Sequence, residues 1–383
     1  MDKRIIILER RLFSAIGHER TQINAINELI GNKKSIVIAC KGINKNDMPF
    51  DNKLIPKLPK LNLEDEGKEL IEYIYESGDI LINVLKRKEL KKIQKMIVPS
   101  ARRLEIALIT YIYNEKKISL NFTTVIRIHD ICFLENLPGS ILLIFSELVN
   151  QGRIKLFSET EELSKKIKSS FKIKSSGSLI LPVSVPYNIN LKRQKKIKNN
   201  IFIGCLGGPR RSKGIFKIPK IIKSLRLYFK RNKEDFKVTF IIQMSKDKKK
   251  RGILFKIKEF LSRYISSSVD VKYIYGIEDS KEFMSLLKKV DIFLLPYSKT
   301  QYKYCGSGFI TDAIFLEKPI ITVKDMSMQN LRQFKNAISA NNIEGYSNAI
   351  TRIAKNYEYY VNNSKLAKKY LKNNIKKTFN KIF

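Results

Sequence analysis

The first half of the chain alternates short apolar runs with segments in which apolar residues recur every three or four positions. Short β-branched runs are typical of buried strands, and three-to-four spacing is typical of one helix face. The predicted strands are Arg4–Leu8, Ser35–Cys40, Asp79–Val84, Thr124–Ile128, Ile154–Phe157 and Leu179–Val185. The predicted helices are Thr21–Leu29, Gly67–Tyr75 and Pro99–Tyr113, with a proline-punctuated loop over Met48–Pro59. Ser158 to Glu161 predicts the cap and acidic first turn of another helix.

The same rhythm begins again after Asn188–Asn200, a basic, asparagine-rich segment that is typical of a linker. The predicted strands of this second half are Ile201–Ile203, Lys237–Met244, Val269–Tyr275, Asp291–Leu295 and Pro319–Val323. The predicted helices are Ile215–Phe229, Gly252–Ile265, Ser280–Leu287 and Ser307–Leu316, followed by a helical tail to Phe383.

Strands that alternate with helices, twice, predict an α/β protein with two Rossmann-like, doubly wound parallel sheets. We expect an N-terminal domain over residues 1–187, a linker over 188–200, a second domain over 201–355 and a basic helical tail over 356–383. Such sheets bind ligands at the carboxyl ends of their strands, where glycine-rich turns lie here. Neither a GxGxxG motif after the first strand nor a GxxxxGK[ST] motif is present, which disfavours a dinucleotide enzyme and a P-loop.

The charge of the chain is strongly basic, with 74 Lys+Arg against 36 Asp+Glu and a formal net charge of +38. Such an excess indicates nucleic acid as a partner. However, most of these cations are lysine, whereas arginine makes the better bidentate phosphate contacts. Lysine also accompanies abundant Ile, Asn, Tyr and Phe, all with AT-rich codons, so much of the excess fits solvated surface. A surface of this charge is attracted to anionic lipid headgroups and polyanions.

Several classes of site are excluded by what the chain lacks. The apolar run Ile106–Tyr113 is too short to cross a bilayer, and Glu9 ends the first apolar run, which predicts a strand rather than a signal peptide. The four cysteines, Cys40, Cys132, Cys205 and Cys305, form no CxxC motif, so reduced thiols and a cytoplasmic location are expected. With 2 histidines, a multi-histidine metal site is not expected.

A glycine-rich run with cations lies between the strand at Ile201–Ile203 and the next helix. It reads Gly204-Cys205-Leu206-Gly207-Gly208-Pro209-Arg210-Arg211-Ser212-Lys213-Gly214. Glycines let backbone amides approach an anion, and a helix N-terminus adds partial positive charge. Arg210 and Lys213 would then bring two cations to a diphosphate. The alternative is a glycine turn that carries incidental basic residues.

A second run follows the strand that ends at Leu295. Pro296-Tyr297 and a polar loop lead to Gly306-Ser307-Gly308-Phe309-Ile310-Thr311-Asp312-Ala313, then to Glu317-Lys318-Pro319-Ile320-Ile321. The Ser-Gly turn starts a helix with exposed amides, and Asp312 lies one turn in, placed to reach a ribose diol. The alternative for Asp312 is an acid that complements the helix dipole.

Together, in this order and spacing, the two runs resemble the nucleotide-diphosphate-sugar domain of GT-B glycosyltransferases, especially the retaining family 4-like group. The matching residues are Arg210, Lys213-Gly214, Pro296-Tyr297, Ser307-Gly308, Ala313 and Lys318-Pro319-Ile320-Ile321. The resemblance implies that Arg210 and Lys213 act on the diphosphate, with Gly204, Gly214, Ser307, Gly308 and Phe309 around it and Asp312 on the ribose. The family's Glu-x7-Glu pair is Tyr304 and Asp312 here, which puts Tyr304 toward the transferred sugar.

The N-terminal half resembles the same family more loosely. Gly17-His18 resembles the glycine-rich loop ahead of the first helix, and the strand that ends in His129-Asp130 resembles one that faces the donor sugar. The resemblance implies a catalytic role for His129 and substrate contacts for Gly17, His18 and Asp130. The alternatives are a loop residue or helix cap for His18 and a polar strand end for His129.

The resemblance implies two domains facing a cleft, with the C-terminal helix crossing back to the first. It also implies transfer of a sugar from a nucleotide-diphosphate sugar to a glycan or lipid-linked acceptor, in cell-surface polysaccharide synthesis. No metal and no cofactor beyond the co-substrate are expected. In a retaining reaction the leaving phosphate deprotonates the acceptor, whereas inversion requires a base, for which His18 and Asp130 are candidates.

Two rival functions are also consistent with the sequence. A basic protein that binds RNA or an acidic partner without catalysis explains the charge, although no RNA-binding motif is present. A catalytically inactive GT-B protein is consistent with the replaced glutamates.

In the tail, lysines interleave with apolar residues from Leu366 to Phe383. These apolar residues either pack on the first domain or rest on an anionic membrane surface.

Overall fold

The computed structural model describes residues 4–12, 17–31, 35–43, 53–59, 68–87, 90, 93–115, 122–191, 199–245, 260, 266–277 and 279–383. The helix expected over Gly252–Ile265 falls, except for Phe260, outside these residues, as does the stretch 192–198 of the expected linker.

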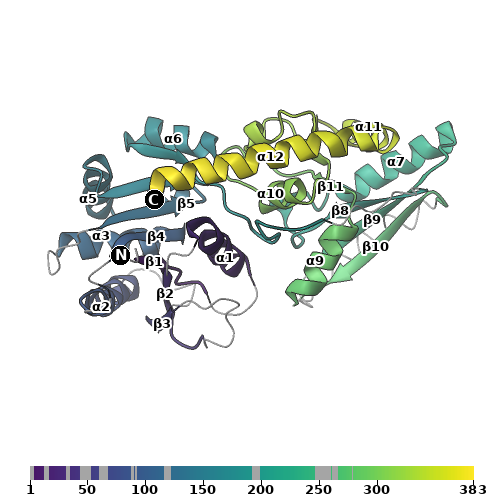
Figure 1. The fold of residues 1–383 in the computed structure, drawn as a ribbon. Helices are drawn as coiled ribbons and strands as arrows, with labels where there is room; N and C mark the ends of the chain where they lie inside the picture. The colour runs from purple at the N-terminus through teal and green to yellow at the C-terminus, as the bar shows by residue number, and fades with distance from the viewer. Residues whose placement is uncertain are drawn as a thin grey trace. The chain divides into compact units, whose positions relative to one another are not determined.

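The chain divides into two compact units, each built on a fully parallel sheet with helices packed on it (Figure 1). Unit 1 comprises Met1–Val183, Tyr304–Gly306 and Asn374–Phe383, and unit 2 comprises Ser184–Lys303 and Ser307–Asn373. The last ten residues therefore belong to unit 1, as expected for a C-terminal helix that returns to the first domain. The predicted α/β class with two parallel sheets is confirmed.

The sheet of unit 1 has seven strands in the order β3-β2-β1-β4-β5-β6-β7. Their bounds are β1 Arg4–Leu8, β2 Ser35–Cys40, β3 Lys53–Leu58, β4 Ile93–Ala101, β5 Thr123–Ile128, β6 Ile154–Ser158 and β7 Ser175–Ser178. The helices are α1 His18–Ile30, α2 Lys68–Leu85, α3 Arg103–Asn114, α4 Cys132–Glu135, α5 Gly139–Asn150 and α6 Glu161–Phe171.

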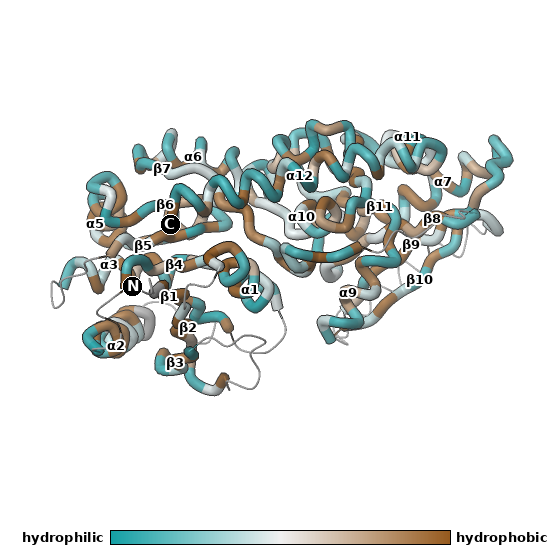
Figure 2. Tube along the Cα trace, viewed as in Figure 1, coloured by the Kyte–Doolittle hydropathy of each residue, from teal (hydrophilic) through white to brown (hydrophobic). Residues whose placement is uncertain are grey.

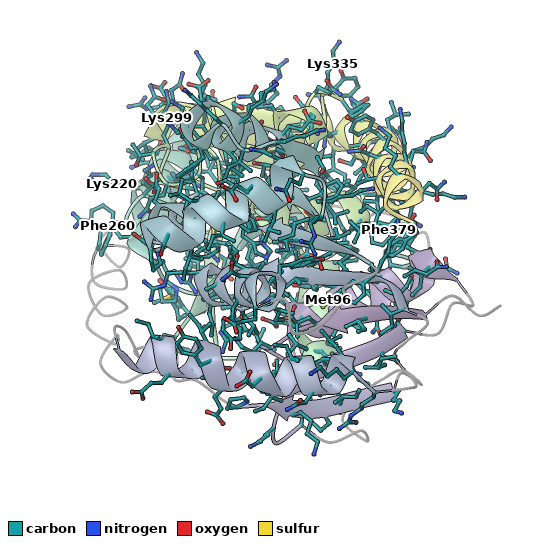
Figure 3. The ribbon with its side chains drawn as sticks, turned by 90° about the vertical axis from the view of Figure 1, so that its left-hand side faces the viewer. Met96, Lys220, Phe260, Lys299, Lys335 and Phe379 are labelled. Atoms are coloured by element: carbon teal, nitrogen blue, oxygen red, sulfur yellow. The ribbon has the colours of Figure 1, made fainter. Side chains whose placement is uncertain are left out.

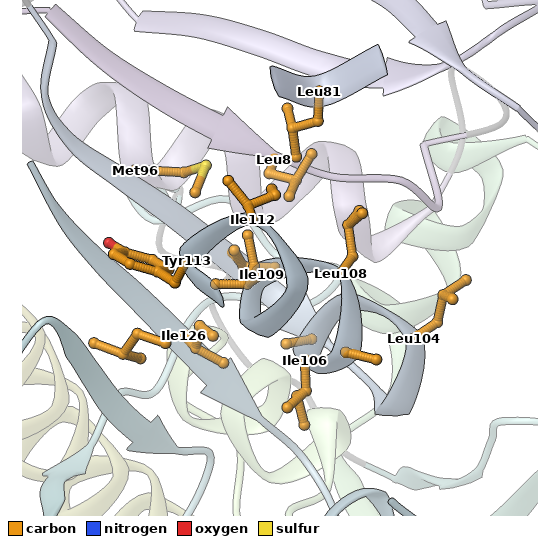
Figure 4. Close-up of a cluster of buried hydrophobic side chains, with 14 of the residues drawn as sticks. Leu8, Leu81, Met96, Leu104, Ile106, Leu108, Ile109, Ile112, Tyr113 and Ile126 are labelled. Atoms are coloured by element: carbon orange, nitrogen blue, oxygen red, sulfur yellow. The ribbon is translucent and has the colours of Figure 1, made fainter. Parts of the chain in front are cut away.

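The core of unit 1 lies between this sheet and its helices. Figure 4 shows Leu8 of β1, Met96 of β4, Leu81 of α2 and the α3 residues Ile109 and Ile112 meeting in one cluster. Their burial follows from the sequence pattern, because β-branched strand residues and one apolar helix face cover each other. Figure 2 shows that the helices carry both hydrophobic and hydrophilic residues along their length.

The sheet of unit 2 has six strands in the order β10-β9-β8-β11-β12-β13. Their bounds are β8 Asn200–Cys205, β9 Lys237–Met244, β10 Val269–Tyr275, β11 Ile292–Leu295, β12 Ile320–Val323 and β13 Ala337–Ala340. The helices are α7 Ile218–Asn232, α9 Ser280–Lys289, α10 Gly308–Phe315, α11 Ile343–Lys355 and α12 Tyr357–Ile382, with short 3-10 turns η3 Arg211–Lys213 and η5 Gln329–Leu331.

The strand order fixes where each sheet offers a crevice. In both units the chain winds outward from a central strand in one direction, then starts again on the other side. The two winding directions part between β1 and β4 in unit 1 and between β8 and β11 in unit 2. At such a switch point the loops beyond the carboxyl ends diverge, and ligands of open α/β sheets bind there.

Several element predictions in the first half are wrong. The helix predicted at Gly67–Tyr75 and the strand at Asp79–Val84 are one helix, α2, in which Gly78 allows close contact with the ring of Tyr111. Pro99 does not start a helix but lies in β4, at an irregularity in the pairing with β5. The loop predicted over Met48–Pro59 contains β3, an edge strand, where a proline is tolerated.

The last strand of unit 1 is also misplaced by the sequence pattern. The apolar run Leu179–Val185 was expected to form it, but β7 is the preceding serine-rich segment Ser175–Ser178. Leu179 is buried beyond the strand end, where its amide donates to the Ser158 carbonyl. In the second half, β13 and α11 occupy part of the region predicted as a continuous helical tail.

The apolar residues of the tail are largely used in packing. Ile375, Phe379 and Ile382 are buried, whereas Leu366 is 55% exposed. Of the two alternatives for the tail, packing inside the protein therefore accounts for most of its apolar residues. Lysines, rather than an apolar stripe, lie on the outer face of α12. Lys220, Lys299 and Lys335 likewise project from the surface (Figure 3). No helix among the described residues is both long and apolar enough to cross a membrane.

Candidate functional site

The glycine-rich run of unit 2 forms a tight loop beyond the carboxyl end of β8. Gly207 and Gly214 have φ values of 96° and 73°, in the left-handed region that favours glycine. A Cβ on Gly214 would lie 2.0 Å from the Pro296 carbonyl oxygen, so the loop packs on the turn after β11. Gly204 lies inside β8, where a Cβ would overlap the Val290 side chain. Close packing alone therefore explains why glycine is found at positions 204 and 214.

Lys213 is a partly buried cation of this loop, held by two contacts. Its Nζ donates to the Gly207 carbonyl at 2.7 Å and lies 5.2 Å from the centre of the Phe309 ring. Burial, together with the neighbouring Arg210, lowers the pKa of Lys213 to about 8. A cation held this way is largely charged at neutral pH but poorly stabilised, so a nearby anion would strengthen its charged form.

Arg210 is exposed and precedes the turn η3. In the described part of the chain, no carboxylate forms an ion pair with either Arg210 or Lys213. The loop therefore carries two positive charges that the protein itself does not neutralise.

The start of α10 lies against this loop. A Cβ on Gly207 would fall 2.4 Å from the Phe309 ring, and Ser307 is the N-cap residue of α10. The first amides of a helix have no carbonyl partner within it, so those of Gly308 and Phe309 add donors beside the cations. The structure therefore brings Lys213, Ser307, Gly308 and Phe309 together, as the sequence predicted. Between β8 and β11 the hollow is only about 10 Å³, close to the volume needed for one water.

Asp312 has a different environment from the one predicted. It is 1% exposed, and its Oδ1 accepts hydrogen bonds from the amides of Ser184 and Val185 at 2.9 and 3.0 Å. The carboxylate anchors the segment that opens unit 2. Contact with a ribose would require it to leave these two amides.

The switch point of unit 1 holds charges that neutralise each other. Arg10, directly beyond β1, donates to Glu105 of α3 at 2.6 Å, and both side chains are buried. The adjacent Glu9 is 2% exposed. Burial, with repulsion from Glu19 and Glu105, raises the pKa of Glu9 to about 8, so it is protonated at neutral pH.

Gly17 and His18 lie at the edge of the same cluster. Gly17 is the N-cap residue of α1, with a φ of 137°, and His18 is its first residue. The Nε2 of His18 lies 3.1 Å from Glu19, which also lies 3.8 Å from Arg11. Although burial alone would raise it, the pKa of Glu19 is lowered by its interactions with His18 and Arg11. His18 is thus at the helix start, and it pairs with a carboxylate there.

His129 ends β5 in a charge cluster with Arg127 and Glu159. Arg127 is 0% exposed and donates to the carbonyls of Leu179 and Pro99 and to Glu159. The Nδ1 of His129 lies 3.5 Å from Glu159. Burial and the Arg127 charge lower the pKa of His129, whereas His129 and Arg127 hold the Glu159 pKa low against the effect of burial. Neutral His129 beside an ionised Glu159 is equipped to accept or share a proton.

The segment Tyr304–Gly306 contacts this cluster within unit 1. The Tyr304 carbonyl accepts from Thr160 at 2.6 Å, and the Cys305 thiol lies 3.0 Å from Asp130. A Cβ on Gly306 would overlap the Glu159 carboxylate. The Tyr304 ring lies under the Lys166 ammonium, 5.9 Å away. The segment that contains Tyr304 thus reaches Asp130 through Cys305, whereas the Tyr304 side chain packs beside α6.

Several residues of these clusters were not identified from the sequence. The sequence pattern places Arg127 in a strand and Glu159 in a helix cap, and it places Glu9 and Arg10 at the end of an apolar run. For Glu9, Arg10 and Glu159 the available signal was a charged residue just after a buried strand, because that position faces the crevice of a parallel sheet. For Arg127 the signal was a charged residue inside the apolar strand β5. Within the described residues, no group of three or more His, Cys, Asp or Glu is arranged to hold a metal ion.

Comparison with solved structures supports the fold. No family model and no curated protein matches the sequence. A glycosyltransferase from Rickettsia africae matches with a TM-score of 0.62 and 12% identity, over 98% of this chain and 94% of that one. HepE of Anabaena, solved with UDP and glucose, matches with a TM-score of 0.63 and 10% identity, over 99% and 98%. An E. coli protein described as trehalose-6-phosphate, bound with UDP-2-fluoro glucose, matches with a TM-score of 0.61 and 10% identity, over 98% of both chains.

These matches run over nearly the whole length of both partners, and they cover both parallel sheets. At such low identity they establish the arrangement of elements and not the chemistry. The chain has the GT-B fold.

Proposed function

We propose that this protein is a glycosyltransferase that takes a sugar from a nucleotide-diphosphate sugar, with the diphosphate bound at the switch point of unit 2. The observation that carries the proposal is the pair of cations, Arg210 and Lys213, which no described carboxylate neutralises beside the first amides of α10. Cations and helix amides in this arrangement are suited to a diphosphate.

The fold relatives support the choice of ligand. HepE was solved with UDP and glucose, and the E. coli protein with a fluorinated UDP-glucose. A UDP-GlcNAc 2-epimerase from Neisseria meningitidis, with a TM-score of 0.57 and 14% identity over 96% of this chain and 98% of that one, was solved with UDP-GlcNAc. We therefore infer a uridine diphosphate sugar as the first donor to test.

The residues of unit 2 would act by stabilising charge. As the bond between sugar and phosphate breaks, negative charge grows on the leaving diphosphate. Lys213, turned from the Gly207 carbonyl, and Arg210 would meet that charge without solvent reorganisation. A positioned donor of this kind is worth roughly 2.7–4 kcal/mol in the transition state. We assign Arg210 and Lys213 as the catalytic cations, with Ser307, Gly308 and Phe309 as binding residues.

The finer features of the reaction extend the same proposal. We propose a retaining and metal-independent transfer, in which the leaving phosphate takes the acceptor proton, and no cofactor beyond the nucleotide sugar. His129, held beside Glu159, and the nearby His18 and Asp130 would contact the sugar or the acceptor hydroxyl. A glycan or lipid-linked acceptor, in cell-surface polysaccharide synthesis, completes the proposal. Contact with an anionic membrane surface would rest on the lysines of α12.

The test is isothermal titration of the full chain with UDP, GDP and single-stranded RNA, followed by donor hydrolysis and transfer assays. We expect UDP or GDP to bind, and Lys213→Ala and Arg210→Ala to lower both affinity and turnover with unchanged melting temperature. Lys220→Ala is the matched control, because Lys220 is exposed and lies on α7 outside the loop.

Three results would contradict parts of the proposal. Near-normal turnover in both loop variants removes the site assignment. Nucleotide binding without hydrolysis or transfer indicates an inactive GT-B protein. Binding of RNA but of neither nucleotide favours a basic binding protein.

A further inference from the structure

Unit 1 contains a cavity of about 460 Å³ that lies outside the nucleotide and sugar sites proposed above. Its walls come from β6, β7, the first turns of α6 and the last turns of α12, all of them within unit 1. It lies over one face of the sheet at its β7 edge, and none of its lining residues belongs to the His129 cluster or the switch point. A volume of this size is within the range of small-molecule sites, roughly 300–1,000 Å³.

Three lysines line the cavity: Lys155 of β6, Lys165 of α6 and Lys381 of α12. One acid, Glu161, lines it as well. None of the three lysines forms an ion pair with a carboxylate in the described part of the chain. Cations gathered around one cavity repel each other, and a bound anion would remove that cost.

The last turns of α12 present a polar face to the cavity. Asn374, Thr378 and Lys381 are spaced by four and three residues, so they lie on one side of the helix. Ile375, Phe379 and Ile382, one position further on, are buried. Because packing of this apolar face fixes the rotation of the helix, the polar face is held toward the cavity rather than free to turn.

Strand β7 supplies hydrogen-bonding groups on the other side. Ser176 and Ser178 line the cavity, and β7 is the last of the described strands in the sheet, so one side of its backbone has no strand partner. Gly177 has a φ of 111°, and a Cβ there would meet no atom within 4 Å. A hydrogen bond of 2.7 Å between the hydroxyls of Ser164 and Ser175 ties α6 to β7.

We propose that this cavity is a second anion site, which binds the phosphate group of a phosphorylated small molecule or headgroup. Lys155, Lys165 and Lys381 would hold the charge, while Ser176, Ser178 and Thr378 would donate to the phosphate oxygens. The site is independent of the nucleotide site, because it lies in the other unit and uses none of the same residues.

The experiment measures pyrophosphate binding in a Lys213→Ala background, which weakens the other candidate anion site. Titrations at constant ionic strength compare Lys165→Gln/Lys381→Gln with a control pair, Lys369→Gln/Lys376→Gln. Both pairs remove two exposed lysines and the same net charge, and one residue of each pair lies in the part of α12 that belongs to unit 1. We expect at least a tenfold weaker pyrophosphate affinity in the cavity pair and an unchanged affinity in the control pair, with all melting temperatures alike.

A second arm separates the two sources of phosphate. Co-sedimentation uses phosphatidylcholine vesicles with and without phosphatidic acid, in the presence and absence of pyrophosphate. Vesicle binding that the cavity pair loses and pyrophosphate displaces indicates a lipid headgroup, whereas pyrophosphate binding alone indicates a soluble ligand. Equal losses in the two pairs would show attraction by net charge only, and no binding of either probe would equally overturn the proposal.

Discussion

The two sheets differ in how charged side chains are paired at their switch points. At the switch point of unit 1, Arg10 is paired with Glu105 and Glu9 is held neutral by burial and by neighbouring carboxylates. At the switch point of unit 2, Lys213 is partly buried beside Arg210, and no described acid compensates either charge. One crevice has satisfied its own charges, and the other has not.

This difference indicates what each crevice is suited to bind. A self-neutralised cluster offers hydrogen-bonding groups without a net field, which suits neutral hydroxyl groups such as those of a sugar. A pair of uncompensated cations beside helix amides suits an anion, because the ligand restores the missing charge. The net charge of +38 alone does not make this distinction, since it says nothing about where cations lack partners.

The largest expected effect comes from removing the partner of Arg10 at the switch point of unit 1. Glu105→Gln leaves the Arg10 guanidinium buried without its counter-charge, which should cost about 3–5 kcal/mol in the free energy of unfolding. Urea denaturation measures it, and Glu147→Gln, on the exposed side of α5, is the control. A loss no larger than that of the control would mean that the Arg10–Glu105 pair does not hold this crevice together.

A smaller effect concerns the protonation of Glu9. Its pKa is about 8 in the folded protein against 4.5 as the reference value. Between these two pH values the unfolded state binds fewer protons, so stability falls as pH rises through this window. Glu9→Gln cannot ionise and should gain on the order of 3 kcal/mol over the wild type by pH 7.

Thermal melts of both proteins from about pH 5 to about pH 8 measure this gain, with Glu76→Gln on the surface of α2 as control. The difference between Glu9→Gln and wild type should grow with pH. A constant difference across the window would show that Glu9 is ionised throughout.

The smallest effect sharpens the role of Asp312 in unit 2. Asp312→Ala leaves the Ser184 and Val185 amides without their acceptor and should cost about 1–3 kcal/mol of stability. Asp312→Asn keeps an acceptor oxygen and should retain most of it. Urea denaturation and UDP titration separate the roles, since weaker UDP binding in a fully stable Asp312→Asn protein would instead support the ribose contact predicted from the sequence.

The sequence predicted most of the parallel strands because β-branched runs such as Ile5–Ile7 are buried on both faces. It failed where local pattern is ambiguous. The apolar stretch at Asp79–Val84 fits a strand or a helix, and β4 is interrupted by Lys95 and Pro99. Strand β7, made of serine and glycine, has no apolar signal at all.

The candidate site was predictable in position but not in its electrostatics. The order of glycines, cations and the Ser-Gly turn placed Lys213 and Phe309 at neighbouring strand ends. The partners of each charge were not predictable, because Arg10 and Glu105 are 95 positions apart and meet only when β1 and β4 pair. For the same reason, no local pattern shows that Lys213 lacks a carboxylate or that Asp312 holds two backbone amides.

The most direct test of the central claim is the pH dependence of UDP binding by the wild type and by Lys213→Ala, measured by calorimetry in buffers of different ionisation enthalpy. Because the pKa of Lys213 is about 8 in the free protein, a diphosphate bound beside it should raise that pKa. We expect proton uptake on binding near pH 8 and an affinity that falls as pH rises further, both absent in Lys213→Ala. Identical pH profiles in the two proteins would contradict it.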